Sequence, residues 1–101
     1  MTVDKLKCRL LESQEKDGFI YSKGVPEKIL ERARYWKEDW FTVFNKLLRH
    51  IKKGDGAPDH NNKNGKVVDN LLGNDRYMAI FFTPYPEGCY LVYDFKIDSL
   101  Q

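Results

Sequence analysis

Two runs of apolar and aromatic residues near the end of the chain form its clearest pattern. Residues 76–83 and 89–98 are rich in aromatic and branched side chains, and the segment 84–88 between them holds two prolines and a glycine. Such runs on either side of a turn segment predict a β-hairpin. In the second run charged and apolar residues alternate, which predicts one buried and one solvent-facing side. The side expected to be buried carries Cys89, Leu91, Tyr93, Phe95 and Ile97.

The region 26–53 has the pattern of a helix. Pro26 followed by Glu27 favours a helix start, because proline lacks an N–H that the first helical turn leaves unpaired in any case. Apolar residues then recur at spacings of three and four, and no further glycine or proline occurs before Gly54. The charged cluster 37–39 would allow a break in which Asp39 caps a second helix. One long helix and two consecutive helices are both consistent with this pattern.

The first residues fit two patterns. Along 5–10 charged and apolar residues alternate, as in a half-buried strand. Over 2–15 helix-forming residues dominate, Thr2 can cap the helix, and Gly18 can end it in the left-handed conformation. We favour a helix, because the alternation is short, and we expect a short strand at 19–21.

The segment 54–66 contains no large apolar side chain and consists mainly of Gly, Asn, Asp and Lys. A segment that cannot bury itself predicts a solvated loop, and at this length we expect it to be mobile or functional. The following residues 67–72, which end at Gly73, predict one or two turns of helix.

Together these elements predict a single α+β domain over 1–101, in which two or three helices pack on an antiparallel hairpin. The order helix, strand, helix, helix, hairpin resembles that of winged-helix domains. A small antiparallel sheet with one long helix is the alternative arrangement. The connection 54–75 is longer than the winged-helix order implies, and the hairpin turn 84–88 carries no basic residue.

Positive charge is concentrated in one part of the chain. The formal net charge is only +2, but residues 46–66 hold six Lys or Arg against two Asp, a net +4 that leaves −2 for the rest. Crowded like charges create a field that attracts polyanions or acidic protein surfaces. The six cations are Lys46, Arg49, Lys52, Lys53, Lys63 and Lys66.

The helical spacing separates this region into two faces. The apolar residues from Trp40 to Ile51 share one face, and Asn45 lies with the cations on the other. Such a face fits a nucleic-acid backbone, where each neutralised phosphate releases counterions, and an Asn can reach base edges. Our leading hypothesis is therefore a small non-enzymatic nucleic-acid-binding or regulatory protein that uses residues 42–66, with Lys63 and Lys66 on a loop that orders on binding.

Two other functions are compatible with the same residues. The first is a protein-binding inhibitor or adaptor, of the kind that mobile elements use, docking on an acidic partner surface through the cations together with Tyr85 or Trp36. The second is a small metal-independent ribonuclease of the toxin type. For that chemistry His50 and His60 are the only candidate catalytic residues, since histidine titrates near neutral pH. The sequence contains no catalytic signature of high specificity, so we favour a protein without enzymatic activity.

The remaining candidate chemistry is limited. Asp55, Asp59 and His60 lack the order of a calcium loop, and the two cysteines and two histidines lack zinc spacing, so we expect neither a metal nor a cofactor. No signal-peptide core opens the sequence and no apolar run reaches membrane-spanning length. We therefore expect a cytoplasmic protein without a membrane partner, in which Cys8 and Cys89 are reduced.

Overall fold

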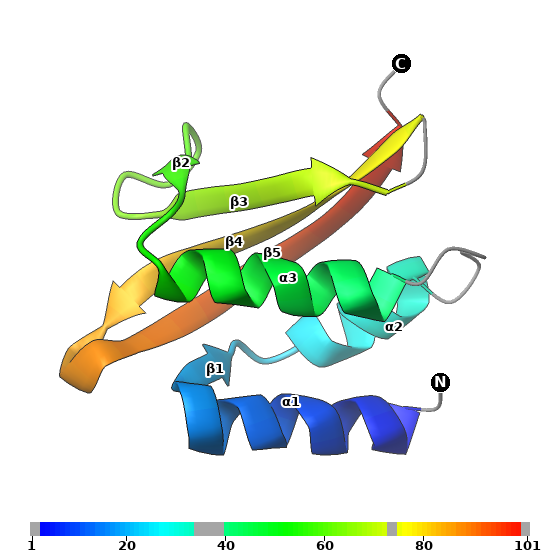
Figure 1. Cartoon of the computed structure of the whole chain (residues 1–101), viewed down its shortest axis with the longest axis horizontal. Helices are drawn as coiled ribbons and strands as arrows, with labels where there is room; N and C mark the ends of the chain where they lie inside the picture. The colour runs from blue at the N-terminus through cyan, green and yellow to red at the C-terminus, as the bar shows by residue number, and fades with distance from the viewer. Residues whose placement is uncertain (1–2, 34–39, 73–74, 100–101) are drawn as a thin grey trace.

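The computed structural model describes residues 3–33, 40–72 and 75–99. Within these residues three helices and a five-stranded mixed sheet form an α+β domain (Figure 1). Its radius of gyration of 12.9 Å matches the value of about 13 Å typical of one domain of this length. The elements in chain order are α1 (Val3–Asp17), β1 (Phe19–Tyr21), α2 (Val25–Ala33), α3 (Trp40–Lys52), β2 (Ala57–Pro58), β3 (Lys66–Leu71), β4 (Arg76–Tyr85), the 3-10 turn η1 (Pro86–Gly88) and β5 (Cys89–Ser99).

The sheet has the strand order β1-β5-β4-β3-β2. Strands β2 to β5 pair antiparallel, whereas β1 pairs parallel with β5. The predicted hairpin is confirmed as β4 and β5. The sheet is larger than this hairpin, because three more strands extend it on both sides, and it is mixed, because β1 is parallel.

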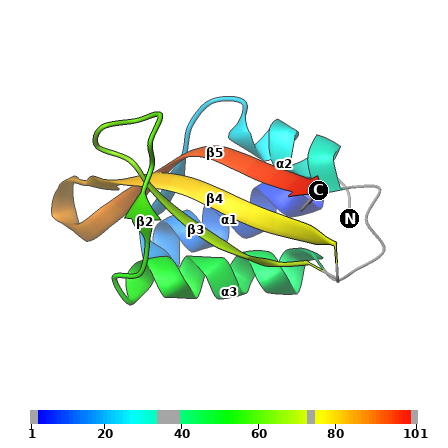
Figure 2. The same ribbon diagram turned by 90° about the horizontal axis from the view of Figure 1, so that it is seen from above.

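Helices α1 and α3 lie on one face of this sheet. In Figure 2, which looks onto the opposite face, α1 lies behind the strands, α3 runs along the β3 side and α2 lies beside β5. Helix α2 contacts β5, which extends well beyond its short pairing with β1. The core lies between helices and sheet, and its fully buried large side chains are Leu6, Phe19, Ile29, Phe44, Leu47, Ile51, Leu72, Met78, Ile80, Val92 and Phe95.

A β-bulge in the hairpin overturns part of the predicted alternation. Phe81 pairs with Asp94 and Phe82 with Val92, so Tyr93 is an extra residue in β5. The extra residue reverses which side chains face the core, because side chains alternate along a strand. Val92 is fully buried on the core side, and Phe95 and Ile97 face the core as predicted. Cys89, Leu91 and Tyr93, expected to be buried with them, are only half-buried.

The N-terminal segment is a helix, as we favoured. Leu6 and Leu10, four residues apart in α1, are both buried in the core, whereas Cys8 between them is exposed, which fits a helical period and not a period of two. Gly18 follows with a φ of 76°, the left-handed conformation that ends a helix at little cost. The short strand at 19–21 is also confirmed.

The segment 67–72 is a strand and not the predicted helix. In β3, Val68 is buried opposite Ile80 of β4, while the exposed Leu71 pairs with Tyr77. The two adjacent valines favour strand conformation, because branched side chains pack well on a pleated surface. The preceding segment, expected to be a loop throughout, contains the short strand β2.

The question of one or two helices over 26–53 falls on residues 34–39, including Asp39 and Trp36, which lie outside the described residues. The element order agrees with the winged-helix order as far as α3. Four strands then follow where that order has a single hairpin.

Candidate nucleic-acid interface

Helix α3 packs its apolar side on the sheet and so determines which residues face outward. The Phe44 ring lies 6.0 Å from the Phe95 ring of β5, and Leu47 and Ile51 are almost completely buried. Because these positions recur at spacings of three and four, the polar residues between them lie on the outer side of the helix.

That outer side carries a line of cations, which we call the α3 stripe: Lys46, Arg49 and Lys53. Their spacings of three and four place them on one face, over about 10 Å at a rise of about 1.5 Å per residue. Lys53 follows the last helical residue, but its N–H still bonds to the carbonyl of Arg49 at 3.1 Å. All three side chains are exposed, and within the described residues none of them forms an ion pair. Helix α3 contains no Asp or Glu.

Lys52 differs from the stripe because it has a partner. Its Nζ lies 3.1 Å from Oδ1 of Asp17 at the end of α1, and both side chains are 46% exposed. The pair connects α1 and α3 and neutralises one cation. Asn45, the candidate base reader, donates its Nδ2 hydrogen to the carbonyl of Phe41 at 3.0 Å. The second hydrogen on Nδ2 and the Oδ1 acceptor remain for a bidentate contact with adenine.

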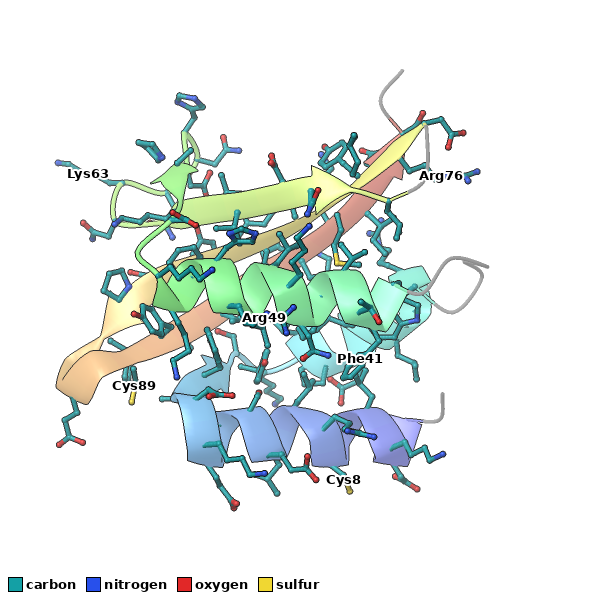
Figure 3. The ribbon with its side chains drawn as sticks, viewed as in Figure 1. Cys8, Phe41, Arg49, Lys63, Arg76 and Cys89 are labelled. Atoms are coloured by element: carbon teal, nitrogen blue, oxygen red, sulfur yellow. The ribbon has the colours of Figure 1, made fainter. Side chains whose placement is uncertain are left out.

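The two loop cations lie in different places. Lys66 begins β3 and lines a recess with Gly54 and Asp55, close to the end of α3. Lys63 lies on the loop between β2 and β3, on the side of the sheet away from α3 (Figure 3). The structure therefore brings Lys66 towards the stripe and separates Lys63 from it.

The two histidines belong to different segments. His50, in the last turn of α3, has Nδ1 2.9 Å from Oδ2 of Asp55. His60 is an exposed residue of the loop beyond β2. No described contact joins the two rings, so the ribonuclease hypothesis stays a prediction from sequence.

The sequence patterns did not indicate a further cavity that the structure contains. A groove of about 600 Å³, here called the sheet groove, lies on the sheet face opposite α1 and α3, because Phe81, which lines it, stands between the core-facing Ile80 and Phe82 of β4. Its lining combines Lys28 and Arg32 of α2, Asn61 and Lys63 of the loop, and the rings of Phe81 and Tyr93. The only sequence signal was the aromatic content of the two strands. The bulge that turns Tyr93 away from the core is not visible in the alternation.

A hydrogen bond from Tyr93 shapes this groove. The Tyr93 hydroxyl donates to Oδ2 of Asp59, which lowers the pKa of the Asp59 carboxyl; a backbone bond from Asn61 acts in the same direction. Burial, and then the neighbouring Asp59, raise the pKa of Tyr93 far above its usual range. The phenol therefore stays protonated at neutral pH and remains a donor to the loop.

Comparison with known proteins finds no matching family model, no similar curated protein and no similar solved structure. Among the described residues no helix combines the length and apolar character that crossing a bilayer requires. In the same part of the chain, no three His, Cys, Asp or Glu side chains gather as a metal site would need.

Proposed function

We propose that the protein binds nucleic acid by laying the phosphate backbone along the α3 stripe. One observation carries the proposal: Lys46, Arg49 and Lys53 form a line of exposed cations for which the described residues provide no carboxylate partner. Cations so arranged contact phosphates through ionic bonds that do not depend on base sequence.

Interaction with the helix dipole explains only part of this arrangement. Cations near a helix C-terminus are favoured by about 0.3–1 kcal/mol, but the effect fades within the last turn. Arg49 and Lys52 belong to that turn, whereas Lys46 lies about one turn earlier. The dipole therefore does not account for the stripe as a whole.

The stripe has few competing carboxylates nearby. Asp17 is engaged by Lys52, and Asp55 by His50. Lys66 extends the positive region beyond the end of α3, next to Gly54. A phosphate backbone could thus follow α3 towards the start of β3. In the winged-helix-like interpretation, α3 would be the helix presented to the nucleic acid.

The number of stripe cations predicts the salt dependence of binding. Three neutralised phosphates imply that the binding constant falls about twenty- to fortyfold between roughly 50 and 200 mM salt, the lower value applying to single strands. Fluorescence anisotropy with labelled duplex DNA, single-stranded DNA and RNA at both ionic strengths measures this fall. A binding constant that does not change with salt would contradict the proposal.

Charge reversal identifies the surface. The double substitution Lys46→Glu with Arg49→Glu should abolish binding while leaving the far-UV circular dichroism spectrum unchanged, because both side chains are exposed. For a control with the same change in charge, single Lys46→Glu is compared with Lys23→Glu, an exposed residue before α2. Equal losses in both single variants would show that net charge alone, and not the stripe, sets the affinity.

A second candidate function is binding to an acidic protein, as an inhibitor or adaptor. Tyr85 favours it: this side chain is 48% exposed at the hairpin turn and lines the same recess as Lys66. Exposed tyrosines supply a large contact area in protein interfaces. Tyr85→Ala should abolish capture of such a partner and leave nucleic-acid binding unchanged, so the two functions can be separated.

A further inference from the structure

The sheet groove is a built cavity with a floor and two walls. Its floor is the outer face of β4 and β5, with the rings of Phe81 and Tyr93. Lys28 and Arg32 of α2 form one wall, and the loop residues Asn61 and Lys63 belong to the other. Its volume of about 600 Å³ lies within the range of about 300–1,000 Å³ typical of small-molecule sites.

The loop wall is held in place by contacts with the floor. The Tyr93 hydroxyl donates to Asp59, and the Thr83 hydroxyl donates to the carbonyl of Asn64 at 3.0 Å. Gly65 packs so closely that a Cβ there would lie 2.0 Å from the Tyr93 oxygen. Two side-chain turns, at Asp59 and Asn62, accept the N–H groups of residues two positions on. Lys63 is therefore carried on a braced segment.

The floor offers aromatic surface outside the core. The ring centroids of Phe81 and Tyr93 are 6.3 Å apart and the ring planes are inclined by 48°. Both side chains are half-buried and lie on the side away from α1 and α3, because Phe81 stands between the core-facing Ile80 and Phe82 and Tyr93 follows the core-facing Val92. A flat ligand can stack on one of these rings and contact the edge of the other, an arrangement that aromatic systems favour.

The charge of the lining favours an anion. Four cationic residues face two carboxylates, Asp59 and Asp94. Asp59 accepts the Tyr93 bond, and Asp94 Oδ1 lies 2.5 Å from Lys28 Nζ, so both carboxylates are engaged. Lys63 is exposed and forms no ion pair with the described residues, and Asn61, two positions earlier, adds an amide to the same lining. An incoming phosphate would gain these donors without breaking an existing pair.

We propose that the sheet groove is a second ligand site, which binds a single nucleotide with its base on the rings of Phe81 and Tyr93 and its phosphate against Lys63. Stacking of a base on aromatic side chains beside cations is the general means of holding an unpaired nucleotide. The site lies on the other face of the sheet from the α3 stripe, so it does not depend on the function proposed for that stripe. The nucleotide is either free or one unit of a single strand.

Calorimetric titration with four probes tests the chemistry of the site. The probes are adenosine 5′-monophosphate, a tetranucleotide of deoxyadenosine, adenosine and inorganic phosphate. We expect the monophosphate or the tetranucleotide to bind at least about tenfold more tightly than adenosine or phosphate, since only a nucleotide uses both ring and cation. Tetranucleotide binding that is tighter than monophosphate binding and is lost in Lys63→Glu identifies a single strand as the source, and equal binding identifies the free nucleotide. Equal affinity for inorganic phosphate would overturn the proposal, as would no binding of either nucleotide form.

Matched substitutions locate the site. Lys63→Glu and Phe81→Leu should each weaken the binding of adenosine 5′-monophosphate about tenfold or more, while Lys53→Glu on the α3 stripe should leave it unchanged. Lys63 is an exposed loop residue, so its variant tests the site even where Phe81→Leu perturbs folding. Loss of binding in Lys53→Glu alone would overturn the groove and point to α3. The α3 proposal fails by a different result, namely that Arg49→Glu leaves duplex binding unchanged.

Discussion

At the residue scale, position 65 requires a glycine because the Tyr93 side chain lies against its backbone. This glycine is buried, and a Cβ would lie 2.0 Å from the Tyr93 oxygen and 2.9 Å from its Cζ. We predict that Gly65→Ala destabilises the protein by about 1–3 kcal/mol, the usual cost of inserting a methyl group into a packed site. The free energy of unfolding from urea denaturation measures this loss.

The contact between Gly65 and Tyr93 also provides a control for this prediction. In a Tyr93→Phe background the nearest atom is absent, so the alanine should cost less there than in the wild type. An unchanged penalty would show that the substitution acts on the backbone and not through Tyr93.

The bond between Tyr93 and Asp59 predicts a dependence of stability on pH. Because the folded protein lowers the pKa of Asp59, the bond contributes its full stability above the unfolded pKa of about 3.9 and loses it as the pH falls through the folded value. The stability gap between the wild type and Tyr93→Phe should therefore be constant from about pH 5 to 7 and narrow below about pH 4. Urea midpoints at neutral and acid pH measure the gap. A gap that widens in acid would contradict this assignment.

At the scale of elements, the pair of Asp17 and Lys52 connects α1 to α3 and withholds one cation from the stripe. Asp17→Asn should free Lys52, tighten duplex binding, and make the negative slope of log K against log salt steeper by about 0.9. The cost in stability should stay below about 1 kcal/mol, because both side chains are half-exposed.

The exposed Asp69 of β3 provides the matched control for this prediction. Asp69→Asn changes the net charge by the same amount on the sheet face away from α3, and should leave the salt slope unchanged. Equal effects of the two substitutions would mean that Lys52 takes no part in binding.

At the scale of the whole molecule, one hydrophobic layer supports both candidate sites. Phe95 is 1% exposed, packs against Phe44 of α3, and sits in β5 between the helices and the outer face. We predict that Phe95→Ala lowers the free energy of unfolding by about 3–5 kcal/mol. This is a large part of the total, which is about 5–15 kcal/mol for a typical domain. The half-buried Phe81, replaced in the same way, should cost clearly less. Urea denaturation followed by circular dichroism compares the two, and equal costs would contradict the layer arrangement.

The local parts of this fold were predictable from sequence. Helix α1, the apolar side of α3 and the hairpin of β4 and β5 each follow from a period of 3.6 or 2 over neighbouring residues. The cation line of α3 was predictable for the same reason, since Lys46, Arg49 and Lys53 are within two turns of each other. Residues 67–72 were assigned wrongly because a short apolar segment fits helix and strand equally well.

Only the tertiary structure decided which segments that are distant in the chain pair with each other. Pairing with β4 makes β3 a strand, and pairing with β5 gives β1 its parallel direction. Tyr93, the unmatched residue of β5, turns outward and donates to Asp59. This bond holds the loop that places Lys63 on the face opposite α3. Composition along the chain determined that positive charge is concentrated in residues 46–66. The register of the strands decided that this charge is divided between two faces, because register depends on contacts that no local periodicity records.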